Sequence, residues 1–232
     1  MITISVHDGH RARIKKQFLE TDLSSFEEHQ VLEFILFYAV PRGDVNPLAH
    51  TLIKKFGSFA AVLEAPISEL LKVPGVGENT ATLLSMLPQL SRYYLMSKTS
   101  REVILNSTHD AGEYLVPRFF GEQEEVVYLL CLDAKGKILS CKCLFRGNVN
   151  STAVSVRKII ETAILCNAVS VIIAHNHTSG IALASKEDKS TTARIFSALE
   201  TVGIRLLDHI IVADDDYVSL ADSGFFNNLI QK

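Results

Sequence analysis

The sequence predicts an α/β protein in which a small all-α domain precedes a domain built on a mixed α/β sheet. Apolar residues recur at helical intervals through residues 27–94, which indicates packed helices. Residues 126–220 instead alternate short β-branched runs with helical segments, which is typical of a sheet covered by helices. A polar stretch over residues 97–106 separates the two patterns. We therefore expect a helical domain over residues 1–98 and an α/β domain over residues 105–232.

The helical domain is expected to contain short helices separated by glycine and proline. Residues 1–24 form a tail or a leading helix that carries a small basic cluster. Five further helices are predicted over residues 27–38, 47–56, 58–65, 68–73 and 79–94. Gly57 ends the second of these five, and the turn Pro74-Gly75-Val76-Gly77 separates the last two.

The α/β domain is expected to begin with a helix over residues 109–116, which Ser107 or Thr108 caps and Pro117 ends. A strand hairpin follows, because an Asp133–Gly136 turn lies between two apolar runs. The predicted strands lie over residues 126–132, 138–145, 169–174, 204–213 and 217–220, and the predicted helices over residues 156–167 and 191–202.

Composition excludes some classes of protein. Hydrophobic residues make up 47% of the chain and charged residues 21%, as in a soluble protein with a substantial core. The formal net charge of −3 provides no overall basic field that would attract nucleic acid or an anionic membrane. The first residues do not resemble a signal peptide, and no apolar run reaches the roughly 20 residues that span a bilayer. We expect a cytoplasmic protein with no membrane partner.

The four cysteines all lie in apolar runs and are expected to be buried free thiols: Cys131, Cys141, Cys143 and Cys166. A soft metal site at Cys141-x-Cys143 is the alternative interpretation. No second cysteine pair completes such a site, so the sequence favours thiols that take no part in metal binding.

The motif with the clearest chemical meaning is His175-Asn176-His177, followed by Ser185 and Asp188. A short β-branched apolar run precedes it, so His175 and His177 are expected to share one face at the end of a strand, with Asn176 pointing away. Ser185 is expected to cap the next helix, and Asp188 to lie one turn further along. Two histidines and one aspartate provide three ligands and leave a fourth position for water, as in catalytic zinc sites. A pair of surface histidines without a function is the alternative.

The spacing of these residues, H-x-H-x7-S-x2-D, resembles the metal signature of the JAB/MPN (JAMM) metallopeptidases. The wider stretches His175–Gly180 and Asp208–Val212 resemble a bacterial branch, the RadC family. The resemblance extends over most of the chain and implies a JAB/MPN-like (cytidine-deaminase-like) fold for the second domain. The chain departs from the family pattern at Thr178, where proline is usual, and at Lys158, where an acid is frequent.

The resemblance also implies an activity. It implies that His175, His177 and Asp188 hold Zn²⁺, and that metal-bound water hydrolyses a peptide or isopeptide bond in a peptide or protein substrate. Neither the substrate nor the oligomeric state can be predicted from the sequence.

A hydrolase of this type also needs a proton shuttle, which in the JAMM enzymes is a glutamate on an earlier strand. Glu125 matches that position, and Glu124 is the alternative because a shift of one residue exchanges the faces of a strand. A solvated acid at the end of a strand is the other interpretation of Glu125. Ser185 is implied to stabilise the oxyanion or to hold the water. Asp208 could orient a ligand imidazole and His209 could be a further site group, although a core or hairpin role fits each equally well.

The turn that contains Gly75 and Gly77 predicts a second kind of site. A helix, a P-G-V-G turn and a further helix resemble the helix-hairpin-helix unit of many DNA-binding proteins, in which backbone N–H groups contact phosphate. Residues 56–59 would form a degenerate first hairpin. Glu78 follows the turn where a phosphate-binding site would favour a cation, and the nearby cations before Arg92 are few: Lys54, Lys55 and Lys72.

Two alternatives to a hydrolase therefore stay open. The chain could be a DNA-associated protein of repair or recombination that binds nucleic acid through the helix-hairpin-helix unit. It could also be an interaction scaffold with a vestigial metal site, although the complete set of ligands argues against that interpretation.

Overall fold

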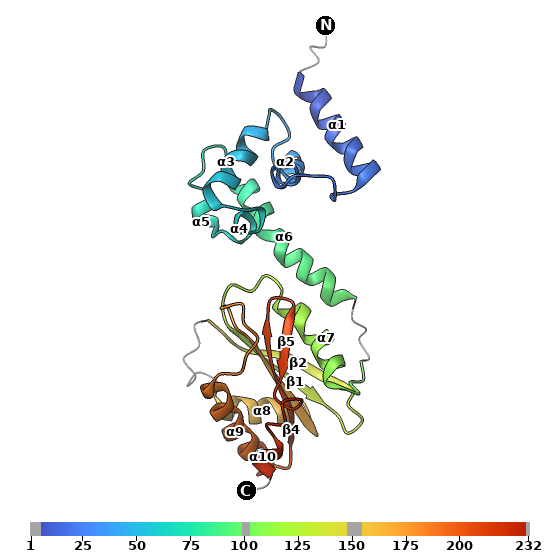
Figure 1. Ribbon diagram of the computed structural model, residues 1–232, viewed down its shortest axis with the longest axis vertical. Coiled ribbons are helices and arrows are strands. Elements are labelled where there is room, and N and C mark those ends of the chain that lie inside the picture. Colours follow the sequence, from blue (N-terminus) through green and yellow to red (C-terminus); the bar gives the residue numbers. More distant parts are fainter. Residues whose placement is uncertain (1–5, 99–102, 148–154, 231–232) are drawn as a thin grey trace. The chain divides into compact units, whose positions relative to one another are not determined.

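The computed structural model describes three stretches of the chain: residues 6–98, 103–147 and 155–230. The chain divides into two compact units, Met1–Leu90 and Ser91–Lys232. The first unit is helical and the second contains a mixed five-stranded sheet with helices (Figure 1). The predicted fold class is therefore confirmed. The division falls inside a helix, and residues 99–102 of the expected linker lie outside the described residues.

The described helices up to residue 98 are α1 (Val6–Thr21), α2 (Glu28–Ala39), α3 (Asn46–Phe56), α4 (Phe59–Glu64), α5 (Ile67–Leu70) and α6 (Glu78–Ser97). They enclose an apolar cluster whose members include the fully buried Leu32, Leu36 and Leu52. Gly57 ends α3 with a φ of 101°, a left-handed conformation that glycine adopts without steric cost. The predicted helix over residues 68–73 is shorter in the structure, because the chain turns after Leu70.

The sheet has the strand order β2-β1-β3-β4-β5. The strands are β1 (Val126–Leu132), β2 (Ile138–Arg146), β3 (Ser170–Asn176), β4 (Arg205–Ala213) and β5 (Asp216–Ser219). Neighbouring β3 and β4 run parallel, and the other neighbouring pairs run antiparallel. The central strand β3 is buried at every residue, as its continuous apolar sequence predicts.

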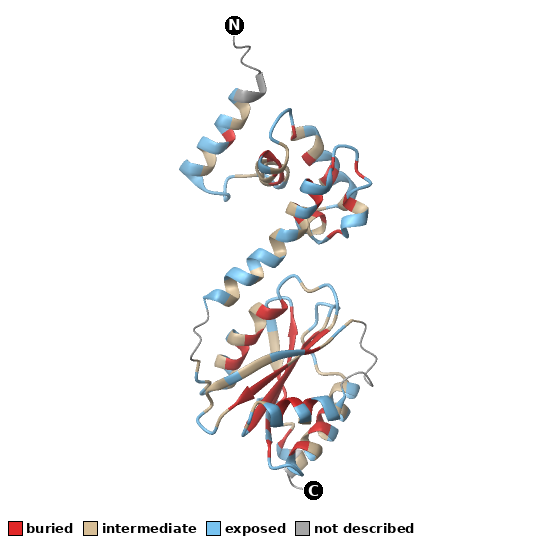
Figure 2. Ribbon diagram, turned by 180° about the vertical axis from the view of Figure 1, so that it is seen from behind, coloured by how far each residue is buried: buried red, intermediate tan, exposed pale blue. Residues whose placement is uncertain are grey.

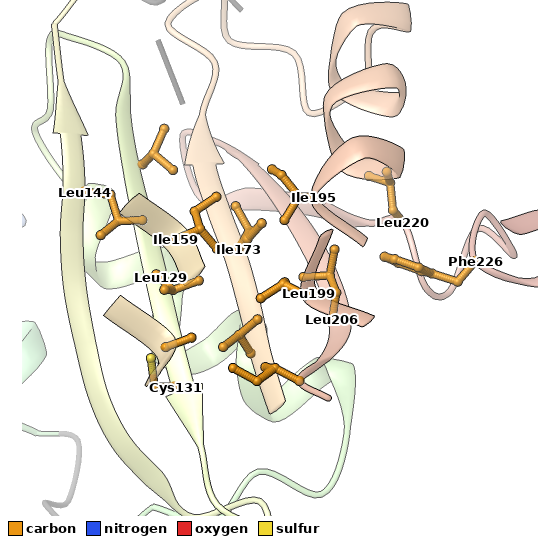
Figure 3. Close-up of a cluster of buried hydrophobic side chains, with 14 of the residues drawn as sticks. Leu129, Cys131, Leu144, Ile159, Ile173, Ile195, Leu199, Leu206, Leu220 and Phe226 are labelled. Atoms are coloured by element: carbon orange, nitrogen blue, oxygen red, sulfur yellow. The ribbon is translucent and has the colours of Figure 1, made fainter. Parts of the chain in front are cut away.

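Helices cover both faces of the sheet (Figures 1 and 2). The described helices that follow α6 are α7 (Thr108–Phe119), α8 (Val156–Leu165), α9 (Lys186–Glu200) and α10 (Asn227–Ile230). Leu115 of α7 packs with Leu130 on one face. Leu129 packs with Ile159 of α8 and Ile195 of α9 on the other face (Figure 3). Successive residues of β1 therefore point to opposite layers, so that β1 contributes to both cores.

None of the helices that the structure describes is long and apolar enough to cross a lipid bilayer.

The prediction that Pro117 ends a helix is wrong, because α7 continues to Phe119 with Pro117 inside it. Proline removes one backbone donor, and this loss is small so close to the end of a helix. Leu115 and Phe119 flank Pro117 and are both buried in the apolar cluster against the sheet. Their packing stabilises the last turn.

Two other expectations need correction. The segment after the described gap is not a free linker, because Ile104 pairs with Lys137 and the Leu105 N–H donates to the Gly136 carbonyl. Helix α9 begins at Lys186, five residues before the predicted start at Thr191. The capping interactions of the preceding residue explain the earlier start.

The cysteines are free, as predicted, but only Cys131 is fully buried. Cys143 is exposed because it lies on β2, which is an edge strand of the sheet. Burial raises the pKa of Cys131 to about 12 and that of Cys141 to about 11, so both are protonated thiols at neutral pH. Among the described residues, no cluster of metal-ligating side chains includes Cys141 and Cys143.

Candidate metal centre

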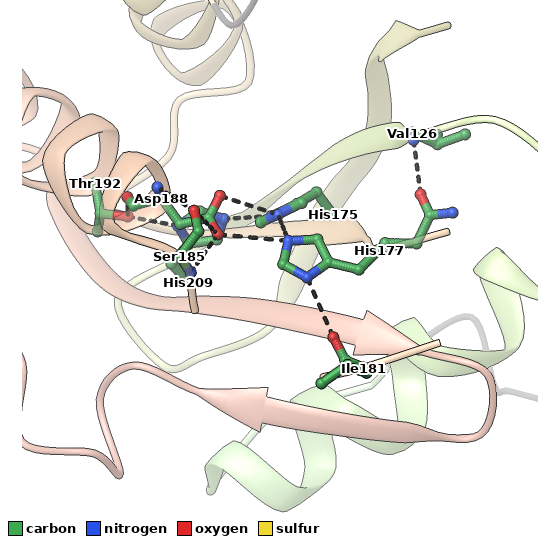
Figure 4. Close-up of polar contacts among 9 residues, drawn as sticks. Val126, His175, His177, Ile181, Ser185, Asp188, Thr192 and His209 are labelled. Atoms are coloured by element: carbon green, nitrogen blue, oxygen red, sulfur yellow. Dashed lines mark hydrogen bonds and ion pairs between the residues drawn. The ribbon is translucent and has the colours of Figure 1, made fainter. Parts of the chain in front are cut away.

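The two histidines of the motif converge at the end of the central strand (Figure 4). His175 is the next-to-last residue of β3, and His177 directly follows the strand. The His177 N–H donates to the Val212 carbonyl at 2.8 Å, so the chain stays in contact with β4 past the end of β3. The two side chains therefore share one face, and their Nε2 atoms lie 3.0 Å apart. This geometry agrees with the expected alternation along a strand.

Asp188 reaches the histidines from the first turn of α9. Ser185 caps this helix, as predicted: its Oγ accepts from the Asp188 N–H at 3.0 Å and donates to Asp188 Oδ2 at 2.6 Å. The Ser185 N–H also donates to Oδ2, at 2.8 Å. Because Ser185 occupies Oδ2 with two donors, Oδ1 is the carboxylate oxygen available to another partner. Oδ1 lies 3.2 Å from His175 Nε2.

A buried hydrogen-bond chain behind His175 determines its tautomer. His175 Nδ1 lies 2.8 Å from His209 Nε2, and His209 Nδ1 lies 2.6 Å from the Thr192 hydroxyl. The hydroxyl donates its single proton to the Asp188 backbone carbonyl, which can only accept. It must therefore accept from His209 Nδ1–H. A neutral His209 then accepts at Nε2 from His175 Nδ1–H, and this leaves the Nε2 lone pair of His175 free.

His177 has the same tautomer for a simpler reason. Its Nδ1 lies 3.2 Å from the Ile181 carbonyl, which is an acceptor, so Nδ1 carries the proton. Both imidazoles thus have a lone pair on Nε2, and the two Nε2 atoms face each other.

These donors fit a metal ion. Two lone pairs that face each other at 3.0 Å repel unless a proton or a cation lies between them. A tetrahedral zinc ion with bonds of about 2.0–2.1 Å would hold its ligand atoms about 3.3 Å apart. The two Nε2 atoms lie 3.0 Å apart and His175 Nε2 lies 3.2 Å from Oδ1, while His177 Nε2 lies 3.4 Å from the other carboxylate oxygen, Oδ2. Within the described parts of the chain, His175, His177 and Asp188 are the one such group that could hold a metal.

The protonation states of these groups favour cation binding. Burial opposes ionisation of Asp188, but hydrogen bonds from the protonated forms of His175 and His177 and from Ser185 outweigh it and hold the pKa of Asp188 well below its usual range. The hydrogen bond to Asp188 raises the pKa of His177, while burial opposes this shift. Burial, followed by the charge of His175, lowers the pKa of His209 to about 3, so His209 is neutral at physiological pH.

The register of the sheet distinguishes the two candidate glutamates. Val127 of β1 pairs with His175 of β3, and this antiparallel register, continued two residues past the end of the ladder, sets Glu125 opposite His177. Glu125 also contributes to the raised pKa of His177, which indicates that its carboxylate lies near this imidazole. Glu124 is exposed and lies in a bend before β1. The structure therefore favours Glu125 as the acid beside the candidate metal centre.

Asp208 and His209 occupy different environments. His209, rather than Asp208, contacts the imidazole of His175, so of the two roles that the sequence leaves open for Asp208 the structure supports the core role. Asp208 instead accepts from the Ser219 hydroxyl at 2.6 Å and from the Ala221 N–H at 2.9 Å, so it stabilises the turn after β5. Burial raises the pKa of Asp208, although these hydrogen bonds oppose the shift. Thr192 was not identified from the sequence, because it belongs to no part of the motif.

The two glycines of the predicted hairpin lie between α5 and α6. Gly75 has a φ of 91°, and Gly77 immediately precedes α6. The local shape thus agrees with a helix-hairpin-helix unit. The charge does not favour phosphate, because Glu78 opens α6, the Lys72 ammonium pairs with Glu69, and the Lys55 ammonium donates to the Glu69 carbonyl.

Comparison with known families identifies the second unit. A family model described as a RadC-like JAB domain matches residues 105–225 of the chain. The matched segment covers more than half of the 232 residues. It contains all five strands of the sheet and the three side chains of the candidate metal centre.

Thr192→Val should weaken metal binding without removing a ligand. Valine keeps the shape of threonine but leaves His209 Nδ1–H without its acceptor, so the tautomer of His175 is less strongly fixed. We expect the affinity for added zinc to fall about tenfold, as for other groups that orient metal ligands. Competition with a chromophoric chelator measures the change. Thr191→Val on the same helix is the matched control and should change the affinity less than about twofold. An equal loss in both variants would contradict the hydrogen-bond chain.

The raised pKa of His177 predicts a dependence of metal binding on pH. A raised pKa means that the imidazole stays protonated to a higher pH than usual, so metal affinity should be lost as pH falls through that pKa. In the metal-free protein, Asp188→Asn should lower the pKa of His177 towards its ordinary value of 6.5. NMR titration of the His177 ring measures this shift. Asp215→Asn, in an exposed turn, is the control, and an unchanged His177 pKa in Asp188→Asn would refute the assignment.

Proposed function

Because the chain belongs to the RadC-like JAB domain family, we propose that it is a zinc-dependent hydrolase of the JAMM type that cleaves a peptide or isopeptide bond. One observation carries the proposal. His175 Nε2, His177 Nε2 and Asp188 Oδ1 converge with their lone pairs unshared, and the acid Glu125 lies beside them. Three such ligands leave one tetrahedral position open, as catalytic zinc sites require.

The identity of the metal is inferred from its donors. Two imidazole nitrogens and one carboxylate oxygen suit zinc better than magnesium or calcium, which favour oxygen ligands alone. When bound, zinc would act as a Lewis acid that lowers the pKa of water and polarises a carbonyl group.

The remaining chemistry falls to residues of the chain. In this proposal the Glu125 carboxylate removes a proton from the attacking water and returns it to the nitrogen of the leaving amine. Both transfers need a carboxylate that can reach the attacking water and the leaving group. The position of Glu125 opposite His177 is suited to this role, whereas Glu124 is exposed in the bend before β1.

Ser185 has two candidate roles. Its hydroxyl donates to Asp188 Oδ2, which supports a role in orienting the carboxylate so that Oδ1 points to the metal. The oxyanion role that the family resemblance implies would require this hydroxyl to change partner during the reaction. We propose that orientation of Asp188 is the resting function of Ser185.

Nucleic-acid binding through the turn at Gly75 and Gly77 is the second candidate function. The left-handed Gly75 and the start of α6 favour it. Engagement of Lys55 and Lys72 by Glu69 argues against it, because nonspecific DNA affinity depends on free cations. Hydrolysis is therefore the better supported proposal.

Hydrolysis can be tested without knowledge of the natural substrate. Zinc-loaded protein is incubated with an amine-blocked peptide library and with peptides linked through a lysine side chain, and mass spectrometry detects newly formed amines. We expect cleavage by the native chain, none by His177→Ala, and a loss of about 100-fold or more in Glu125→Gln with zinc retained. Glu124→Gln is the matched control and should remain active. Absence of any cleavage by the zinc-loaded native chain would refute the proposal.

A further inference from the structure

Asn176, between the two histidines, makes two hydrogen bonds to the strand that carries Glu125. Its Oδ1 accepts from the Val126 N–H at 2.7 Å, a bond drawn in Figure 4. Its Nδ2 donates to the Glu124 carbonyl at 3.0 Å. These two main-chain groups lie directly before and after Glu125. The Asn176 side chain is buried, with 6% of its surface exposed, so the bonds are shielded from water.

An amide side chain is needed at position 176 because the β1–β3 ladder ends just before it. The ladder between β1 and β3 ends at the pair Val127 and His175. Beyond it the main chain follows β4, to which His177 donates. Without the Asn176 side chain, the Val126 N–H and the Glu124 carbonyl would have no hydrogen-bond partner on the β3 side of the strand. An asparagine amide has one donor group and one acceptor, like a peptide group, and so continues the ladder by one pair.

The main chain of Glu125 is also hydrogen-bonded on the side that faces β2. The Gly147 N–H, at the end of β2, donates to the Glu125 carbonyl at 3.0 Å. Three hydrogen bonds therefore restrain the main chain around Glu125. Two of them come from the side-chain amide of Asn176, in the segment that provides the histidines.

We propose that Asn176 is a positioning residue that restrains the main chain on both sides of Glu125 and so keeps its carboxylate opposite His177. The proposal rests on the proton-transfer role of Glu125 in the proposed function. It gives a reason for the alternation in His175-Asn176-His177: the odd positions direct imidazoles to the metal, and the even position anchors the neighbouring strand from the opposite face.

The placement of Glu125 can be tested without any activity. Asn176→Ala removes both bonds. Asp133→Ala is the matched control at the other end of β1, because Asp133 Oδ1 accepts from the N–H groups of Lys135 and Lys137 at 2.7 and 2.9 Å. In the full chain, we expect hydrogen exchange of the Val126 amide to accelerate about tenfold in Asn176→Ala and to stay unchanged in Asp133→Ala. A crystal structure of Asn176→Ala should show the Glu125 carboxylate displaced from His177.

The kinetic test uses the library peptide that the native chain cleaves fastest. Asn176→Ala should lower kcat about 10- to 100-fold, with KM and zinc affinity changed less than about twofold, because a misplaced proton shuttle slows the chemical step. In a Glu125→Gln background, Asn176→Ala should have almost no further effect, since the group that it positions is already absent. Asp133→Ala should leave kcat unchanged.

Two results would overturn the inference. One is an equal loss of kcat from Asn176→Ala in the native and Glu125→Gln backgrounds, or a parallel loss of zinc affinity, because either would indicate a general structural role. The other is an unshifted Glu125 with unaltered Val126 exchange in Asn176→Ala. If the native chain cleaves no peptide, the proposed function fails, and the exchange and crystallographic results still decide whether Asn176 positions Glu125.

Discussion

The hydrogen bond between His175 Nδ1 and His209 Nε2 is the interaction on which the rest of the candidate centre depends. It is buried, and it continues through His209 to the Thr192 hydroxyl. Because His209 is neutral, the direction of this bond is set, and the proton of His175 stays on the side away from Asp188. The Nε2 lone pair that could bind a metal is therefore a consequence of packing between β4, α9 and β3. The fold determines the protonation state before any ligand arrives.

In the segment from the end of β3 to the start of α9, the same residues form secondary structure and shape the candidate metal centre. Because side chains alternate along a strand, those of His175 and His177 point to one face of the sheet and that of Asn176 points to the other. Ser185 both begins α9 and occupies one oxygen of Asp188, so helix capping and carboxylate orientation are a single set of contacts. A change in the start of α9 would therefore also move a candidate ligand. Local secondary structure and site geometry depend on each other here.

Much of this could be predicted from the sequence, because the relevant interactions are local. The strand before His175 and the cap at Ser185 follow from residue types at short spacing. The role of His209 could not be decided, since it depends on how β4 is aligned with β3. Thr192 gave no signal at all, because only the packing of α9 brings it to His209. Likewise, choosing Glu125 over Glu124 required the register between β1 and β3.

The remaining errors have the same origin. Pro117 was expected to end a helix, but the burial of Leu115 and Phe119 against the sheet extends it. Cys143 was expected to be buried, but the strand order places it on an edge. Both are tertiary effects that override a local preference.

Anomalous diffraction at the zinc absorption edge, from crystals of the full chain grown with zinc, shows whether these three side chains bind one ion. We predict a single peak about 2.0–2.2 Å from His175 Nε2, His177 Nε2 and Asp188 Oδ1, with the contact between His175 Nδ1 and His209 preserved. A metal bound through Nδ1 of either histidine, or no peak at these three atoms at saturating zinc, would contradict this prediction.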